Sequence, residues 1–281
     1  MKGAFNQMSI FTVDQTKCKK DGICAAECPI SIISMPDKES FPAWAQGAEQ
    51  MCIGCGHCVA VCPQGAISLG DMSPEKCSPV RGELLPGPEQ AEHFLLTRRS
   101  IRKYKEQPVE RELLQRIIQI ASYAPSGHNL QPVHWLVIEK KEEIKRLSGM
   151  VIDWMRFMLK EKPEFALSLH MDKVVAGWDA GYDKICRGAP HLILAHAPKA
   201  LPPAPAACTI ALAYLELAAY SMGLGACWAG YFGAAAGLYP PLLQALALPE
   251  GHQAYGALMI GYPQFSYHRI PLRKEPAVTW R

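Results

Sequence analysis

The chain has 281 residues, a net charge of +3 and 11 cysteines. This length suits two domains, one small and one large enough for a full core, and the small net charge gives no reason to expect a nucleic acid partner. The first residues do not read as a charged segment followed by an apolar stretch, so we expect a cytoplasmic protein rather than a secreted one.

A dense cysteine run dominates the first 80 residues. Positions 52–63 read Cys-Ile-Gly-Cys-Gly-His-Cys-Val-Ala-Val-Cys-Pro. Two-residue gaps let three thiolates converge on one iron–sulfur cubane, while a fourth cysteine followed by proline turns toward a second cluster. Zinc sites usually separate two cysteine pairs by about a dozen residues or more, so the spacing favours iron–sulfur over zinc. One such run predicts a partner run.

The partner run lies 34 positions upstream, as an internal repeat. Crossed ligation gives one complete 4Fe-4S cluster the thiolates of Cys28, Cys52, Cys55 and Cys58. The second cluster receives Cys18, Cys24 and Cys62. Asp21 stands where the repeat expects a fourth cysteine, and it is either an oxygen ligand or a solvated loop residue. An oxygen donor makes its iron more labile, so this cluster is either 4Fe-4S or 3Fe-4S.

The repeat resembles the bacterial two-cluster ferredoxins over about residues 10–72. Cys77 lies outside the repeat and reads as a linker thiol. We therefore expect a ferredoxin-type iron–sulfur domain at residues 1–80, a linker at 81–89 that contains Pro86 and Pro88, and a second domain at 90–281.

The second domain begins with a predicted helix at 89–97, followed by the basic run Arg-Arg-Ser-Ile-Arg. If that run is extended, Arg98, Ser100 and Arg102 point to one side, where two guanidinium groups and a hydroxyl suit a phosphate group. An amphipathic helix is expected at 110–123 and an apolar strand at 133–138, with a loop between them.

Residues 206–239 carry one charge, Glu216, over a length that could cross a bilayer. Five glycines break the second half into turns, and a charge in the first half is costly in lipid, so we expect no membrane span. The prediction is instead a fully buried helix at 206–222, in the centre of a large core or at a subunit interface.

Four motifs together resemble the FMN-dependent nitroreductase family over about residues 90–281. They are Arg-Arg-Ser-x-Arg from position 98, Ala-Pro-Ser-x-x-Asn-x-Gln-Pro from 124, Gly-Leu-Gly-Ala-Cys-Trp-Ala-Gly from 223, and Gly-Tyr-Pro from 261. The resemblance implies an α+β domain with a mixed central sheet. It also implies a homodimer that binds FMN at the subunit interface.

The resemblance assigns cofactor contacts to matching positions of this chain. They are Arg98, Arg99, Ser100, Arg102, Pro125, Ser126, Gly127, Asn129, Gln131, Ala229, Gly230, Arg273 and Lys274. Of these, Ala229 and Gly230 match the backbone that faces the flavin N5, and Arg273 and Lys274 match a phosphate contact whose spacing is ambiguous. The flavin carries the chemistry in this family, so no catalytic side chain is expected.

Two side chains near these positions have alternative interpretations. His128 is either a proton donor to the product or a solvated loop histidine. Trp228 is either a core residue or a ring that stacks on the flavin.

The two resemblances together imply an oxidoreductase. Electrons would pass from a reduced ferredoxin or NAD(P)H through the clusters to FMN, and then to a nitroaromatic, a quinone or an activated alkene. The alternative is an electron relay or redox sensor that acts on a protein partner without turning over a small substrate. No Gly-x-Gly-x-x-Gly run follows a predicted strand, but related enzymes bind nicotinamide without one.

Overall fold

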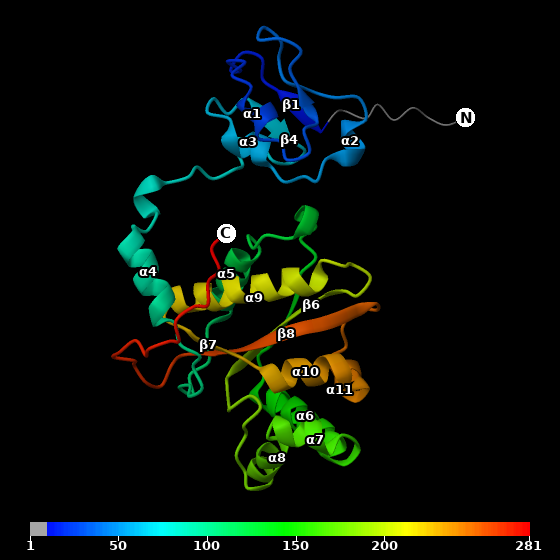
Figure 1. Cartoon of the computed structure of the whole chain (residues 1–281), viewed down its shortest axis with the longest axis vertical. Helices are drawn as coiled ribbons and strands as arrows, with labels where there is room; N and C mark the ends of the chain where they lie inside the picture. Colours follow the sequence, from blue (N-terminus) through cyan, green and yellow to red (C-terminus); the bar gives the residue numbers. More distant parts are fainter. Residues whose placement is uncertain (1–9) are drawn as a thin grey trace, which may run out of the picture. The chain divides into compact units, whose positions relative to one another are not determined.

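The computed structural model describes residues 10–281 and divides the chain into two compact units (Figure 1). The first comprises residues 10–85 together with the short stretch 128–130. The second comprises residues 86–127 and 131–281.

The first unit is made of very short elements. Its strands pair antiparallel, β1 (Phe11–Val13) with β4 (Ile67–Leu69) and β2 (Ile33–Ser34) with β3 (Ala43–Trp44). Its helices are α1 (Ile23–Ala26), α2 (Ala48–Met51) and α3 (His57–Val61). α1 and α3 each follow a glycine with φ 73°, Gly22 and Gly56. A φ in this left-handed region suits glycine, so the repeat in the sequence is also a repeat of backbone conformation.

A connecting segment with exposed side chains separates the first unit from the helices of the second. It holds one turn of 3-10 helix, η1 (Gly82–Leu84), after which α4 (Pro88–Thr97) begins the second unit. Pro88 suits the first position of α4, because its missing N–H would have no partner inside the helix.

The second unit is organised around a four-stranded sheet with the order β5-β6-β8-β7. The strands are β5 (His134–Ile138), β6 (His191–Pro198), β7 (Gly225–Trp228) and β8 (His252–Gly261), and neighbours pair antiparallel. Ser100 forms one parallel bridge to Ala226 of β7. We expected a sheet with both parallel and antiparallel pairing, and this bridge is its parallel part.

Helices cover both faces of the sheet (Figure 1). α5 (Arg111–Ala121) and α9 (Ala204–Ser221) pack on one face. On the other face, α6 (Lys141–Glu161) and α10 (Gly230–Leu238) lie against the sheet. Three further helices pack on these two, namely α7 (Pro163–Ser168), α8 (Met171–Asp179) and α11 (Pro240–Ala245). Alternate residues of β6 serve the two faces: Leu192 and Leu194 pack toward α6, and Ile193 and Ala195 toward α9.

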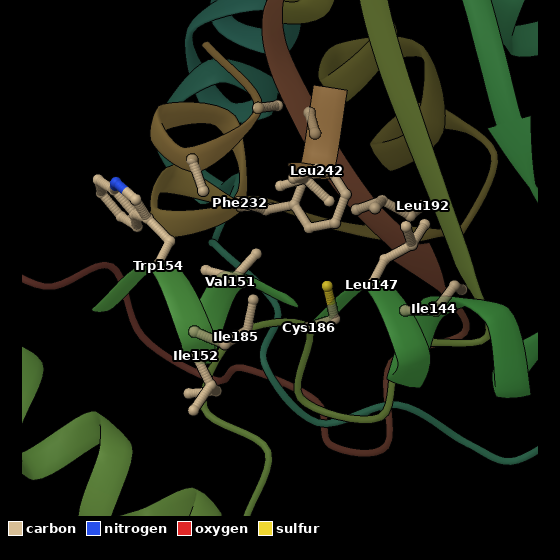
Figure 2. Close-up of a cluster of buried hydrophobic side chains, with 14 of the residues drawn as sticks. Ile144, Leu147, Val151, Ile152, Trp154, Ile185, Cys186, Leu192, Phe232 and Leu242 are labelled. Atoms are coloured by element: carbon tan, nitrogen blue, oxygen red, sulfur yellow. The ribbon is translucent and has the colours of Figure 1, made fainter. Parts of the chain in front are cut away.

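Figure 2 shows part of the core on the α6 side, which contains more buried residues than the core on the α9 side. Leu147, Val151 and Phe232 are at most 1% exposed. Full burial of such a side chain stabilises the fold by about 1.5–3 kcal/mol each. This unit therefore has a core sufficient to fold around its own side chains.

α9 corrects one prediction. The helix forms, but it is not fully buried, since Ile210 is 37% exposed and Tyr214 is 40% exposed. The opposite side packs on α5 and the sheet. Within residues 10–281, α9 is the one helix that is long and apolar enough for a membrane span, and half of it is buried against the rest of the protein. An apolar helix buried on one side is a common feature of a soluble core, so this finding is weak evidence for a span.

Candidate functional site

The cysteines of the first unit surround two separate cavities. One is lined by Cys28, Cys52, Cys55 and Cys58. The other is lined by Cys18, Cys24, Cys62 and Asp21. The cavities divide the ligands in the way that crossed ligation requires, with one cysteine of each run contributed to the cluster of the other. A donor set of this kind fits two iron–sulfur clusters, and the assignment of each thiol to iron stays a prediction.

Backbone N–H groups point at several of these sulfurs. Lys20 donates to Cys18 Sγ at 3.4 Å, Gly54 to Cys52 Sγ at 3.5 Å, and Ala66 to Cys62 Sγ at 3.3 Å. Such bonds stabilise negative charge on sulfur. Burial, followed by the nearby Cys55 and Cys52, raises the pKa of the Cys58 thiol to about 11. A bound cation would lower the free energy of the buried Cys58 thiolate, as the predicted cluster requires.

Asp21, which lies just before α1, lines the cavity of the incomplete set and also accepts a backbone hydrogen bond. Its Oδ1 accepts a hydrogen bond from the Ile23 N–H at 3.2 Å, at the start of α1. The carboxylate thus lies at the position where the repeat expects a thiolate, and its ligation of iron stays a prediction.

The backbone of the basic run, residues 98–102, is extended. The prediction that its alternate side chains point to one side assumed this conformation. The Ile101 N–H donates to the Ala226 carbonyl at 2.8 Å, and the Ile101 side chain is buried. A Cβ on Gly225 would lie 2.7 Å from Ile101, so this close approach requires glycine. Because Ile101 faces inward against β7, its neighbours Ser100 and Arg102 point to the other side of the segment.

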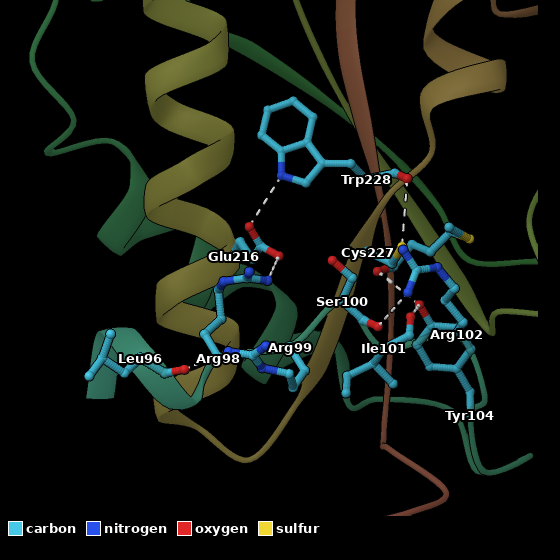
Figure 3. A network of polar contacts seen from close by, with 11 residues as sticks. Leu96, Arg98, Arg99, Ser100, Ile101, Arg102, Tyr104, Glu216, Cys227 and Trp228 are labelled. Carbon is cyan, nitrogen blue, oxygen red and sulfur yellow. Dashed lines mark hydrogen bonds and ion pairs between the residues drawn. The ribbon is translucent and has the colours of Figure 1, made fainter. Parts of the chain in front are cut away.

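Arg98 belongs to a buried polar network (Figure 3). Its Nη1 donates to Glu216 Oε1 of α9 at 2.8 Å, and the indole Nε1 of Trp228 donates to Glu216 Oε2 at 3.2 Å. Glu216 is 8% exposed, whereas Trp228 is 38% exposed. The structure therefore brings the predicted residues Arg98, Ser100 and Arg102 beside the end of β7, where Ala229 and Gly230 follow.

The two predicted backbone contacts differ in their hydrogen bonds. The Ala229 N–H donates to the Ala257 carbonyl at 2.9 Å. Gly230 opens α10, and a Cβ added there would meet no heavy atom within 4 Å. Of the two, Gly230 is therefore the one with open space beside its backbone.

The predicted flavin loop has an unusual backbone. His128, Asn129 and Gln131 have φ of 52°, 53° and 45°, in a left-handed region that residues other than glycine rarely adopt. The Ser126 hydroxyl accepts the Gln131 N–H at 2.9 Å and braces the loop. Pro125 and Gly127 are exposed, as is His128. Strained backbone of this kind clusters at functional sites, which makes the loop a site candidate in its own right.

Sequence reasoning missed a basic cavity of about 550 Å³ on the Arg99 side of the run. Arg99, His93, His268 and Arg269 line it together with Tyr220 and Tyr267, and no acidic side chain is among the described residues of its wall. By contrast, the predicted Arg273 and Lys274 are exposed in the irregular tail and do not line it. The sequence signal for Arg269 was weak, because it is one of several basic residues near the end of the chain.

Glu216 was also missed as a site residue. Its signal was visible in the sequence, because it is the single charged residue in the helix that spans Ala204–Ser221. A lone carboxylate in an apolar helix needs a partner when it is buried, and the sequence did not show that Arg98 and Trp228 would meet it.

Comparisons with known proteins match both regions of the chain. The Nitroreductase family model matches residues 95–262, and a 4Fe-4S dicluster domain model matches residues 16–67. A curated relative, NADH dehydrogenase from Thermus thermophilus, is 30% identical in an alignment 205 positions long that covers 66% of this chain and 93% of the relative.

Solved structures match the larger region. A nitroreductase with bound FMN from Desulfitobacterium hafniense is 25% identical with a TM-score of 0.53, over 66% of this chain and 93% of that one. A nitroreductase with bound FMN from Bacteroides fragilis is 22% identical with a TM-score of 0.51, over 68% of this chain and 95% of that one, and supports the fold.

Proposed function

The chain belongs to the nitroreductase family and carries a 4Fe-4S dicluster domain, and from this premise we propose that it passes electrons through two iron–sulfur clusters to FMN. The electrons come from a low-potential donor, a reduced ferredoxin or NAD(P)H. They end on a small organic acceptor such as a nitroaromatic, a quinone or an activated alkene.

The observation that carries this proposal is the arrangement around β7. The extended run 98–102 is bridged to β7, and the next residues along the chain are Ala229 and Gly230. This places guanidinium groups, a hydroxyl and an uncrowded backbone next to one another, which suits the phosphate, the ribityl chain and the ring of a flavin. When bound, FMN accepts electrons singly and delivers them in pairs.

The residues of this chain have separate tasks in the proposed reaction. Arg98 and Arg102 bind and neutralise negative charge, and Trp228 offers a partly exposed aromatic surface. The basic cavity beside Arg99 suits a phosphate ester, which both FMN and NAD(P)H carry.

We further propose a homodimer with FMN at the interface. The exposed apolar side chains Ile210 and Tyr214 of α9 support this proposal, because a second copy would remove them from water. The Desulfitobacterium relative binds FMN, and the loop 125–131 of one subunit would then contribute to a flavin site shared with its partner.

FMN affinity tests the proposed site. Arg98→Gln is expected to raise the FMN dissociation constant by about 10- to 100-fold, because a hydrogen bond to a charged group contributes about 1.5–3 kcal/mol. Arg116→Gln makes the same change on the exposed side of α5 and is the matched control. The measurement is a titration of apoprotein with FMN, followed by flavin fluorescence. Equal affinity for wild type and Arg98→Gln would remove this site from the proposal.

A further inference from the structure

Glu216 is a buried carboxylate with both oxygens engaged. Its side chain is 10% exposed and pairs with Arg98, whose side chain is 24% exposed. Oε1 accepts from Arg98 at 2.8 Å and Oε2 accepts from Trp228 at 3.2 Å (Figure 3). One side chain of α9 therefore joins two segments that lie 130 positions apart, counted from Arg98 to Trp228.

Stability alone does not explain this network. A buried ion pair is often no more stabilising than apolar side chains of the same volume, because both charges lose their hydration. The rest of α9 carries no charge and is mostly apolar, so a leucine at this position would suit the helix. The carboxylate is better explained by what it does to its two partners.

The two partners are the residues that frame the proposed flavin site. Arg98 opens the extended run, and Trp228 ends β7 directly before Ala229 and Gly230. A carboxylate that binds both fixes the guanidinium and the indole in one geometry. It also offsets the positive charge of Arg98 in a poorly solvated place, where charges interact more strongly than in water.

We propose that Glu216 is a positioning residue of the flavin site, which sets the charge that Arg98 presents to FMN and the orientation of the Trp228 ring. This inference rests on the proposed function. Reduced FMN carries negative charge, so an Arg98 without its carboxylate would favour the reduced form. Glu216 thereby keeps the flavin potential low enough for delivery to the acceptor, and it holds the indole as a fixed wall beside the ring.

The test compares Glu216→Gln with Glu139→Gln. Glu139 forms an exposed ion pair with Arg111 at 2.6 Å and supplies the same chemical change away from the site. At a fixed ambient potential, Glu216→Gln is expected to raise the ratio of reduced to oxidised FMN by about tenfold, which is about 30 mV for a two-electron couple. Glu139→Gln is expected to match the wild type. The measurement is an anaerobic, dye-equilibrated titration of the holoprotein.

Two further variants separate charge from orientation. Trp228→Phe keeps an aromatic ring but removes the N–H, so it should raise the KM for a nitroaromatic about tenfold or less and leave the FMN ratio near wild type. In an Arg98→Gln background, Glu216→Gln should change the FMN ratio by less than about twofold, since the charge it offsets is gone.

The outcomes are distinguishable. If wild type binds no FMN, the proposed function fails. If wild type binds and reduces FMN but Glu216→Gln matches it in the FMN ratio, the positioning role is overturned, whatever happens to thermal stability. Should the Gln variant not fold, Glu216→Asp keeps the charge on a shorter side chain. It must then leave the FMN ratio within about twofold of wild type while raising the KM, and a tenfold change in the ratio would contradict the proposal.

Discussion

Among residues 10–85, one cluster of seven buried side chains forms the core of the first unit, and two of these are cysteines that line the cluster cavities, Cys24 and Cys58. The second unit buries two separate apolar clusters, one on each face of a four-stranded sheet. A small set of apolar side chains on strands of two or three residues supplies little folding free energy. The first unit therefore needs its clusters as part of the core, whereas the second unit builds its core from side chains.

Removal of iron should have the largest effect, and it should affect the first unit alone. We expect an iron chelator under reducing conditions, or Cys55→Ser, to unfold residues 10–85 while the second unit stays folded, because the clusters replace most of the missing core. Hydrogen exchange of backbone amides measures both units at once. Cys77→Ser is the control, since Cys77 is exposed and lines neither cluster cavity. Full amide protection of β1 and β4 without iron would contradict this account.

Truncation of a core side chain should destabilise the second unit. Phe232 of α10 is fully buried, and Phe232→Ala is expected to lower the free energy of unfolding of the second unit by about 3–5 kcal/mol. Phe157→Ala is the matched control, because that ring is 52% exposed. Urea unfolding provides the measurement, followed by tryptophan fluorescence, to which five of the six tryptophans contribute from the second unit. A cost equal to that of the control would mean that this core is not well packed.

Acid should weaken the second unit through three histidines at one end of its sheet. The rings of His134, His196 and His252 have centroids 4.8–5.5 Å apart, and Nδ1 of His196 lies 2.9 Å from Nδ1 of His252. Burial, then the neighbouring His252 and His134, lowers the pKa of His196 to about 4. The unfolded chain takes up this proton near pH 6.5. Stability is therefore full above about pH 6.5 and falls as the pH drops toward about 4.

We expect this loss to reach about 2–3 kcal/mol at the acid end of that window. His196→Gln should flatten the dependence, whereas His93→Gln, on the exposed side of α4, should leave it unchanged. Hydrogen exchange of the β6 amides as a function of pH provides the measurement. A dependence that persists in His196→Gln would assign the effect to another group.

The smallest expected effect lies within the first unit. Asp21→Cys would give the second cavity a fourth thiolate, as the other cavity already has. Since thiolate holds iron more firmly than an oxygen ligand does, we expect iron to be lost several-fold more slowly in air. Iron content and EPR over time measure it, with Asp71→Cys, an exposed position, as the control. Identical rates of iron loss would show that Asp21 is a loop residue.

Local patterns made much of the architecture predictable. The helices near 89–97 and 110–123 and the strand near 133–138 form within two residues of their expected ends. The alternation of side chains in the basic run was also predictable, since Ile101 points to the opposite side from Ser100 and Arg102. Periodicity and turn residues act over a few positions, so the sequence carries them directly.

Long-range pairings were not predictable in the same way. Glu216 meets Arg98 across 118 positions, and Arg269 joins Arg99 in the basic cavity across 170. Neither pairing leaves a periodic signal, because each depends on how the strands and helices pack. The prediction that the helix at 206–222 is fully buried was wrong for a related reason. Composition could not show that Ile210 and Tyr214 would face outward.

The most direct test of the central claim is an anaerobic reductive titration of the purified protein, with iron, sulfide and FMN quantified. Absorbance and EPR spectra are recorded before and after a nitroaromatic or a quinone is added. We predict that two clusters and one flavin per chain are reduced, and that all reoxidise rapidly when the acceptor is added. Clusters and flavin that stay reduced with every small acceptor would contradict the enzyme and favour a relay to a protein partner.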